Sequence, residues 1–529
     1  MGKTARVFGF PAFASAMNVK EFLEKYTGEG TVYATRIKRG KREFAIVQFK
    51  ADKDAELIGM KKMFFFLSHL QAEYKLELSY ENIRRIHLHH CHGQPLKQLL
   101  IQLLGAPRIY GKETRPSGQD DFYIRDIDDD QWVRTTDFTS TRGIGQSSDI
   151  CLEIPFHQKL PDFKENFGYY KEDTDQLSLE SGSSYSCNLE HVPIVAPPEG
   201  INLPYSILFK VCSLVQKGCL SGLKLDADFY KLVDPQRMNT AVIEYTLGDL
   251  KECCYEPVEW LREQQKKFMA TTRHPKPSTI ALGPGLLYIH RVQITPSKIY
   301  FCGPEANVSN HVLRQYPDDI ENFLRVSFAD EELGKMFSTD LISKSSLAIE
   351  NGHTAIYRRI LSTLRNGISI GSKNFEFLAF STSQIRECST WFFASRPGLT
   401  AWDIRAWMGD FSQIKNAAKY ATRLGQSLSS SIETLIAEKS EIEIIPDVEG
   451  GTRRVEYNFS DGIGKISAEF ARGVSQACGL TALTPSAFQI RYGGYKGVVA
   501  VDPSSSKKLS LRGSMCKYDS PDTKLNVLE

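Results

Sequence analysis

Cations beside glycines, close to the carboxyl end of the chain, are the residues whose types and spacing best suit chemistry. Phe488, Ile490 and Tyr492 alternate with Gln489 and Arg491, Gly493-Gly494 follows, and Lys496-Gly497 opens a second apolar stretch. An alternating segment followed by a glycine pair predicts a β-hairpin with a two-residue turn. A lysine next to a glycine approaches a phosphate closely, because glycine has no side chain in the way. The predicted chemistry is the binding of phosphate groups.

Four more cations extend this predicted site: Arg491 in the same hairpin, Lys465 in Asp461-Gly-Ile-Gly-Lys-Ile-Ser467, and Arg512 and Lys517 further on. Residues 487–518 hold six Lys or Arg against one Asp. A local excess of this kind suits a polyanion, but charge runs are also common on solvated surfaces, and this alternative stays open. Asp461 is a lone carboxylate, which cannot hold two metal ions, so we expect it to stabilise a turn.

Two other clusters are similar to metal sites in composition only. Asp126-Ile-Asp-Asp-Asp130 lacks the glycine that shapes a tight metal-binding turn, so we expect a solvated loop. His87-Leu-His-His-Cys-His92 is rich in zinc-ligand residue types. Strand alternation would divide its side chains between two faces, and no second ligand pair follows at finger-like spacing. We therefore predict no metal site in this chain.

The first 80 residues show the order β-α-β-β that is typical of an RNA-recognition-motif fold. Strands are predicted at 7–10, 31–38 and 42–49, and Ser15 is expected to cap a helix with apolar residues at Val19, Phe22, Leu23 and Tyr26. Phe8 and Phe44 would stack on RNA bases, next to Lys41 and Arg42. Residues 1–50 hold ten Lys or Arg against four Glu. RNA binding and a purely structural scaffold are both consistent with this pattern.

The remaining chain divides into three regions. Residues 84–190 are strand-rich, with strands predicted at 83–90, 99–104, 132–138 and 151–155, and a polar, proline-rich stretch marks the boundary near 178–204. Residues 191–270 are predicted to be helical, and Pro275 and Pro277 lie in a linker. Residues 280–529 begin with strands at 286–295 and 298–301. Within them, 404–425 is predicted as a helical region with Ile414, Ala417, Ala418 and Ala421 on one face, ending at Gly425.

Composition narrows the class of protein. The chain has 529 residues, 41% hydrophobic and 24% charged, which suits several globular domains. A net charge of +2 does not by itself indicate a nucleic-acid partner. Eleven cysteines without a paired spacing favour a reduced compartment, and no apolar run approaches the ~18 residues of a membrane span. We expect a nuclear or cytoplasmic protein that is neither secreted nor bound to a membrane.

The basic segments resemble a known family. The stretches 461–467, 485–503 and 511–518, together with 370–393 and 404–425, are similar to the core of the eukaryotic RNA-dependent RNA polymerases of RNA silencing. The chain from Met1 onward resembles the amino-terminal half of the plant type-one members. The resemblance implies an α+β multidomain fold: an RNA-recognition-motif-like module (1–80), a pleckstrin-like β-rich domain (84–190), a helical connecting region (191–270) and an incomplete double-psi β-barrel polymerase core (280–529).

The resemblance also implies a function. Members copy single-stranded RNA into double-stranded RNA from nucleoside triphosphates with Mg²⁺, which supplies small interfering RNA and antiviral defence. On this basis Lys496 approaches the triphosphate, Arg491 and Lys465 line the template or product backbone, and Arg512 and Lys517 complete a basic wall. Gly513 departs from the bulkier residue usual in the family, which affects how Arg512 is oriented.

Catalysis in the family also requires an Asp-x-Asp-Gly-Asp loop, and this sequence contains none. We therefore expect a truncated chain without catalytic residues, inactive alone, that binds no Mg²⁺ by itself. Without the facing barrel, its last ~25 residues are expected to be poorly ordered. The alternative is a non-catalytic RNA-binding or interfering protein.

Overall fold

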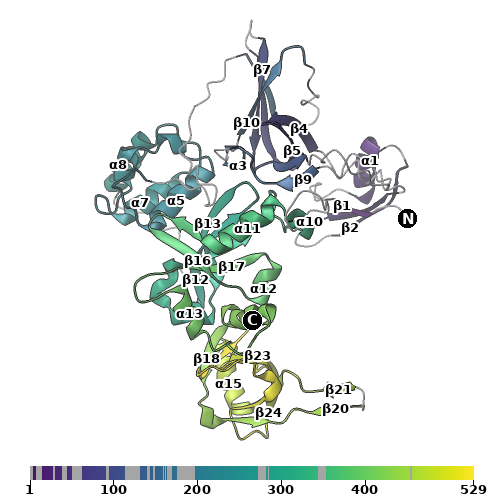
Figure 1. Ribbon diagram of the computed structural model, residues 1–529, viewed down its shortest axis with the longest axis vertical. Coiled ribbons are helices and arrows are strands. Elements are labelled where there is room, and N and C mark those ends of the chain that lie inside the picture. The colour runs from purple at the N-terminus through teal and green to yellow at the C-terminus, as the bar shows by residue number, and fades with distance from the viewer. Residues whose placement is uncertain are drawn as a thin grey trace. The chain divides into compact units, whose positions relative to one another are not determined.

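In a computed structural model the chain forms two compact units. The first comprises Met1–Thr136 with Ser147–Ser178, and the second Asp137–Gln146 with Leu179–Glu529. Both combine strands and helices, so the α+β multidomain fold is confirmed (Figure 1). The structure describes residues 4–7, 15–27, 30–38, 44–49, 62–90, 95–112, 132–139, 143–146, 149–158, 160, 163, 169–174, 197–271, 282–283, 285–342, 353–452 and 455–528.

The start of the first unit has the predicted β-α-β-β order, although its first strand is Thr4–Val7 and shares only Val7 with the strand predicted at 7–10, of which 8–10 lie outside the described residues. Its sheet has the antiparallel order β1-β3-β2. The Ser15 hydroxyl accepts a hydrogen bond from the Asn18 backbone N–H at 3.1 Å, so the predicted helix cap is confirmed. Val19 and Leu23 of the helix are buried, as its apolar spacing predicts. The elements are β1 (Thr4–Val7), α1 (Ala16–Thr27), β2 (Val32–Lys38) and β3 (Phe44–Phe49).

Two four-stranded sheets follow in the first unit, in the orders β4-β5-β8-β9 and β10-β7-β6-β11. Met63 and Leu78 of one sheet share a core with Ile86 and Leu99 of the other, because alternate side chains of each strand face inward. The four strands predicted in this region are present as β6, β7, β9 and β10, whereas the β4–β5 hairpin was not predicted. The elements are β4 (Lys62–His69), β5 (Ala72–Ser79), η1 (Tyr80–Asn82), β6 (Ile83–His89), β7 (Leu96–Leu103), β8 (Arg108–Lys112), β9 (Trp132–Thr135), β10 (Asp149–Pro155) and β11 (Tyr170–Asp173).

Helices open the main part of the second unit, as predicted. Phe209 and Val211 of α5 are buried in one core with Val292 and Leu324 of the sheet that follows, so the helices cover one face of that sheet (Figure 1). The elements are α3 (Gly143–Gln146), α5 (Tyr205–Gln216), η2 (Gly222–Lys224), α6 (Ala227–Leu232), α7 (Thr240–Asp249) and α8 (Pro257–Ala270).

A six-stranded sheet in the order β13-β12-β14-β17-β16-β15 forms the middle of the second unit. Its other face packs Leu378 and Phe393 against Ile404 and Met408, which follow later in the chain. The strands are β12 (Leu286–Ile294), β13 (Ile299–Val308), β14 (Phe323–Phe328), β15 (Ile368–Ile370), β16 (Lys373–Ala379) and β17 (Ser389–Ala394). The helices are α9 (His311–Gln315), η3 (Pro317–Asn322), α10 (Ser338–Leu341), α11 (Ala355–Asn366), α12 (Thr382–Arg386) and α13 (Ala401–Trp407).

The carboxyl-terminal part contains a seven-stranded sheet in the order β18-β26-β23-β24-β22-β25-β19, with α15 packed on it, and a separate two-stranded sheet of β20 and β21. β22 runs parallel to β24, and β19 runs parallel to β25, within an otherwise mainly antiparallel arrangement. The elements are β18 (Ile432–Ile436), η6 (Lys439–Glu441), β19 (Ile442–Ile445), β20 (Glu449–Thr452), β21 (Val455–Asn458), β22 (Ile463–Ser467), α15 (Ala468–Ala477), β23 (Ala487–Tyr492), β24 (Tyr495–Asp502), β25 (Leu509–Arg512), η7 (Gly513–Met515) and β26 (Lys524–Val527).

The expectation that the last ~25 residues are poorly ordered is wrong. β26 lies between β18 and β23, and Leu525 is fully buried in the core of the sheet. The reason is that β18, which the sequence analysis did not assign, supplies the neighbour that β26 needs to satisfy its backbone hydrogen bonds.

The predicted helical region at 404–425 is interrupted. α13 ends at Trp407, and a second helix, α14 (Ala417–Leu424), continues into the 3₁₀ turn η5 (Gly425–Leu428). Ala417 and Ala418 are exposed, so the predicted apolar face is wrong. α14 does end at Gly425, as predicted. The φ of Gly425 is −70°, so this glycine is not a left-handed cap. Glycine is required here because a Cβ atom would lie 1.8 Å from the Phe380 carbonyl oxygen.

No helix among the residues that the structure describes is long and apolar enough to span a bilayer.

The contact at Gly425 makes a testable prediction about stability. Gly425→Ala should lower the free energy of unfolding by about 1–3 kcal/mol, because a methyl group is forced against main-chain atoms of a packed core. The measurement is the urea unfolding curve of the chain followed by circular dichroism. Gly248→Ala is the matched control: it lies in α7 with no atom within 4 Å of its added Cβ, and alanine there should be neutral or stabilising. An equal loss in both variants would contradict the prediction.

Candidate functional site

The predicted hairpin at the basic segment is confirmed. β23 and β24 pair antiparallel, with Tyr492 opposite Tyr495 and Gly493-Gly494 as a two-residue loop. The φ angles of Gly493 and Gly494 are +50° and +87°, which is the left-handed region that the tight hairpin turn requires. Phe488, Ile490 and Tyr492 are buried in the core of the sheet, as their alternation predicts. The intervening residue Arg491 is therefore directed to the opposite face.

Arg491 and Lys496 lie directly opposite each other in the hairpin register, so their side chains share one face. Burial lowers the pKa of Lys496, and its charged neighbours Arg491, Arg423 and Lys517 lower it further. All three of these neighbours are cations. Among the described residues, no carboxylate forms an ion pair with Lys496. We call Arg423, Arg491, Lys496 and Lys517 the cation cluster.

Arg491 is the most enclosed member of the cation cluster. Burial lowers the pKa of its guanidinium to about 10, although the nearby Tyr518 hydroxyl opposes this shift. One guanidinium nitrogen donates to the Ile490 carbonyl at 2.9 Å, while the buried Nε has no hydrogen-bond partner in the described part of the chain. A buried cation without a compensating anion is costly, so the arrangement favours an incoming anion.

The other predicted cations are engaged by internal acceptors. Lys465 pairs with Asp502 at 2.8 Å, which holds the pKa of Asp502 well below its usual range. Arg512 donates from Nε to the Ile463 carbonyl at 2.8 Å and from a terminal nitrogen to the Pro446 carbonyl. The ammonium of Lys517 donates to the Ser514 carbonyl. Arg512 is thus fixed in spite of Gly513, and these contacts favour structural roles for Lys465 and Arg512.

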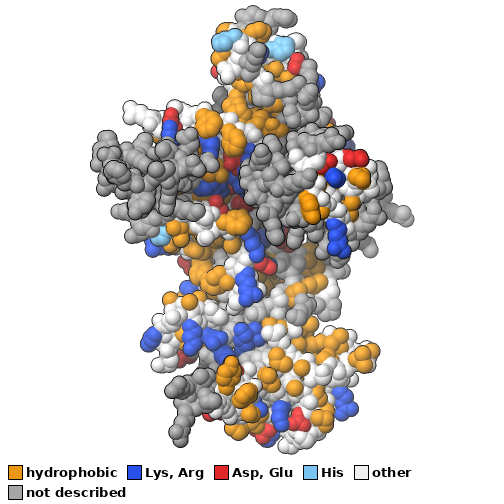
Figure 2. All heavy atoms as spheres, turned by 90° about the vertical axis from the view of Figure 1, so that its right-hand side faces the viewer, with side chains coloured by type: hydrophobic (Ala, Val, Ile, Leu, Met, Phe, Trp, Pro, Cys, Tyr) orange, Lys and Arg blue, Asp and Glu red, His pale blue; other side chains and the backbone are white. Residues whose placement is uncertain are grey.

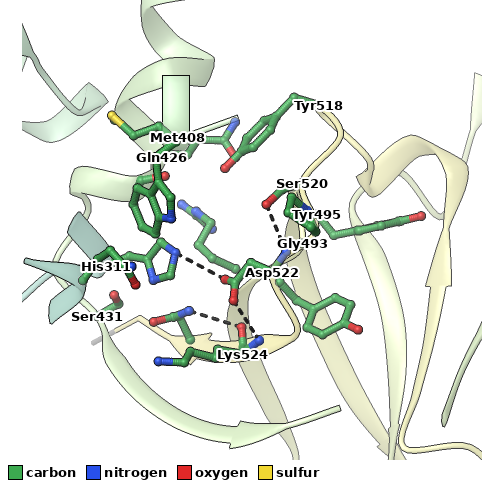
Figure 3. Close-up of a pocket in the computed structure, with 18 residues that line it drawn as sticks. His311, Met408, Gln426, Ser431, Gly493, Tyr495, Tyr518, Ser520, Asp522 and Lys524 are labelled. Carbon is green, nitrogen blue, oxygen red and sulfur yellow. Dashed lines mark hydrogen bonds and ion pairs between the residues drawn. The ribbon is translucent and has the colours of Figure 1, made fainter. Parts of the chain in front are cut away.

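A cavity of about 200 Å³ lies beside the hairpin turn (Figure 3). Arg491 lines it together with His311, whose Nε2 lies 3.3 Å from a carboxylate oxygen of Asp522. Burial lowers the pKa of His311, and Asp522 opposes that shift. Gln426 also lines the cavity: the residue is 5% exposed, and neither its amide oxygen nor its amide nitrogen has a hydrogen-bond partner among the described residues. The cavity therefore offers unsatisfied hydrogen-bond groups next to the cation cluster.

Sequence reasoning missed His311, Gln426 and Arg423. His311 and Gln426 are isolated polar residues in α9 and η5, and only the folding of distant segments onto the hairpin brings them to one cavity. Arg423 carries a weak signal, because it lies in the last turn of a helix that resembles a family segment.

On the face drawn in Figure 2, Lys and Arg side chains form a band at the height at which Figure 1 draws α13 and β18.

The residues at the hairpin do not fit a divalent metal ion, because the described charges closest to Lys496 are cations. Asp461 is exposed and belongs to no group of metal-ligand type among the described residues, and 126–130 lies outside them.

One group of suitable geometry exists in the first unit: donor atoms of His87, His89 and Asp173 lie within 4.8 Å of one another. The two histidines share a face as alternation requires, and the third donor comes from β11, far away in the sequence.

The predicted RNA-binding residues of the first module are not placed. Phe8, Lys41 and Arg42 lie outside the described residues, and Phe44 is described only as the first residue of β3. Their role remains a prediction.

Comparisons with known proteins agree with this architecture. The sequence profile of the family "RNA dependent RNA polymerase" matches residues 294–529, that of its helical domain matches 193–276, and that of an "RDR2 PH-like domain" matches 37–178. The chain belongs to the RNA-dependent RNA polymerase family.

Two plant relatives define its place in that family. RNA-dependent RNA polymerase 1 of Arabidopsis thaliana is 50% identical over the whole chain and 54% of its own length. RNA-dependent RNA polymerase 2 of the same plant is 39% identical over 86% of the chain and 41% of its own length. The chain thus spans about half the length of these relatives. A solved structure, RNA dependent RNA polymerase QDE-1 from Thielavia terrestris, aligns over 63% of this chain and 37% of its own at 16% identity with a TM-score of 0.43, too distant to support an argument.

The cation cluster predicts a difference between two lysines of the same sheet. Lys496→Ala should weaken binding of inorganic tripolyphosphate to the chain by tenfold or more, because a charge-assisted hydrogen bond is lost. Lys465→Ala is the matched control and should change little, because Lys465 is already neutralised by Asp502. Isothermal titration calorimetry measures both. A larger loss for Lys465→Ala would contradict the assignment.

The same site predicts a pH dependence. The pKa of Lys496 is lowered in the free protein, and a bound phosphate favours the charged amine, so binding takes up a proton. Affinity for tripolyphosphate should therefore fall as the pH rises through the lowered pKa of Lys496. Lys496→Arg keeps its charge and should flatten this part of the profile. An unchanged profile in Lys496→Arg would show that another group titrates.

Proposed function

We propose that this chain is the cation-bearing part of an RNA-directed RNA polymerase that copies single-stranded RNA into double-stranded RNA for RNA silencing and antiviral defence. The observation that carries the proposal is the cation cluster on the β23–β24 hairpin, in a chain that belongs to the polymerase family. Phosphoryl transfer requires cations that neutralise the incoming triphosphate, and fixed positive charge in a partly buried site does so without reorganisation.

Within this function the side chains have different roles. Lys496, whose described charged neighbours are all cations, is proposed to bind the triphosphate. Arg491 is proposed to contact the same phosphates or the RNA backbone from the adjacent strand. Lys517 is proposed to contribute charge, whereas Lys465 and Arg512 mainly hold β22 and β25 in place through Asp502 and the Ile463 carbonyl.

The domain assignment is also a proposal. We infer an RNA-recognition-motif-like module at 1–80, a pleckstrin-like domain at 84–190, a helical connecting region at 191–270 and a double-psi β-barrel core at 280–529. The helices α5–α8 and the seven-stranded sheet support the last two. β4 and β5 belong to one sheet with β8 and β9, so we infer that the second domain begins near residue 62 and not at residue 84. Mg²⁺ and compartment, nucleus or cytoplasm, remain predictions from the family.

The proposal is tested in a version of the protein extended to the length of its relatives. Lys496→Ala should lower nucleotide incorporation on a single-stranded RNA template by at least tenfold, with an unchanged melting temperature, because charge that develops on the phosphates loses its nearest cation. Lys465→Ala should retain most activity. Full activity in Lys496→Ala would overturn the role of this lysine.

The alternative function is non-catalytic RNA binding or interference with another polymerase. It is distinguished by the extended wild-type protein: RNA binding without template-dependent incorporation of nucleotides would favour the alternative and overturn the polymerase proposal.

A further inference from the structure

The β4-β5-β8-β9 sheet of the first unit has an unusual outer face. Its inner face packs Met63 and Leu78 into the core, whereas strand alternation directs Phe64, Phe66, Lys75, Tyr110, Lys112 and Trp132 outward. We call these six residues the aromatic face. Phe64 is 47% exposed and Phe66 is 66% exposed, which is far more than a sheet stabilised by its own core requires. Two large exposed rings on adjacent outward positions form a contiguous apolar surface, not scattered residues.

The aromatic face is curved around Lys75. Phe66 on one edge strand and Trp132 on the other have ring centroids 5.7 Å apart, although two strands separate them in the sheet. The Lys75 ammonium lies over three rings, 4.6 Å from the centroid of Tyr110, 5.4 Å from Trp132 and 5.7 Å from Phe64. Lys112 lies 5.9 Å from the centroid of Trp132. Rings and cations therefore alternate at contact distance across the whole width of the sheet.

The outward positions of this sheet also carry Lys62, Arg108 and Arg134, and the described carboxylates there are Glu73 and Glu77. Glu77 pairs with Lys62 at 2.6 Å and lies 4.0 Å from Arg108, and Glu73 pairs with Lys112. Among the described residues, cations therefore outnumber carboxylates on this side of the sheet. Lys75 forms no ion pair with a carboxylate among the described residues, so its charge is compensated by ring faces alone.

We propose that the aromatic face binds single-stranded nucleic acid, with bases stacked on Phe64, Phe66 and Trp132 and a phosphate at Lys75. Exposed rings interleaved with cations recognise single strands, because every unstacked base has a π-face and a phosphate follows at each step. A duplex keeps its bases stacked and cannot use the rings. This inference does not rest on the polymerase proposal, and it concerns a sheet other than the one that contains Phe44.

The size of the face limits the length of RNA that it can bind. Neighbouring strands are ~4.8 Å apart, so four strands span roughly 15 Å, which accommodates two or three stacked bases. Affinity for a short oligonucleotide should therefore reach its plateau at a few nucleotides, and it should fall with salt as phosphate contacts are screened.

The test uses the full 529-residue chain carrying Lys496→Ala, so that the contribution of the cation cluster is reduced equally in every variant compared. Fluorescence anisotropy with a labelled six-nucleotide single-stranded RNA measures affinity, and circular dichroism verifies folding. Phe66→Ala should weaken binding about tenfold, because each base stack contributes on the order of 1–3 kcal/mol. Phe66→Trp should restore it. Lys75→Gln should weaken binding and also reduce its salt dependence, which the loss of a ring does not do.

Matched controls separate the aromatic face from general surface effects. Tyr169→Ala removes an aromatic side chain that is 73% exposed and adjoins the other sheet of this unit, and it should bind RNA like the parent. A duplex of the same sequence should bind more weakly than the single strand. The proposal is overturned if folded Phe66→Ala and Lys75→Gln bind like the parent, or if an acidic peptide of equal charge competes as well as the RNA does.

Discussion

The carboxyl-terminal part of this protein depends on how closely the backbone at Tyr518 approaches the hairpin turn. A Cβ atom on Gly494 would lie 1.9 Å from the Tyr518 carbonyl oxygen, so only glycine permits the contact. The Lys517 backbone N–H then donates to the Gly494 carbonyl at 3.1 Å, and the Tyr518 ring packs on Phe411 at 4.7 Å. One main-chain approach thus connects the hairpin with the end of the chain and with the helices that precede the sheet. It also forms one wall of the cavity at Arg491.

Electrostatics separates two kinds of cation in this sheet. Lys465 and Lys508 are close to carboxylates, at 2.8 Å and 2.7 Å, and such pairs contribute little beyond holding strands in register. Lys496 is surrounded by charges of its own sign and is partly buried, which disfavours its charged form in two ways. An anionic ligand would offset this cost by supplying a counter-charge, and this is the physical basis for proposing that Lys496 binds a phosphate group.

The sequence predicted local features well and long-range ones poorly. The hairpin followed from alternation and a glycine pair, and the Ser15 cap followed from its side chain and the apolar spacing after it. By contrast, Gly425 looked like an ordinary helix stop, while its actual constraint is the Phe380 carbonyl from a different element. The order of the last strand could not be predicted, because β26 depends on β18, about ninety residues earlier. His311 and Gln426 carry no local pattern at all, since their common cavity exists only in the folded chain.

The two candidate surfaces differ in the physics of recognition, and this difference explains why the net charge of the chain is uninformative. The cation cluster is compact and partly desolvated, so it suits a small ligand of high charge density, for which Coulomb energy dominates. The aromatic face spreads a modest excess of charge among exposed rings, so it suits a flexible polymer that offers one ring and one phosphate per unit. Neither local excess of cations is visible in the net charge of the chain, which is only +2, because acidic residues elsewhere in the sequence offset these cations. What matters is which cations lack a carboxylate partner and what surrounds them; among the described residues, Lys496 and Lys75 are two such cations, in two different environments.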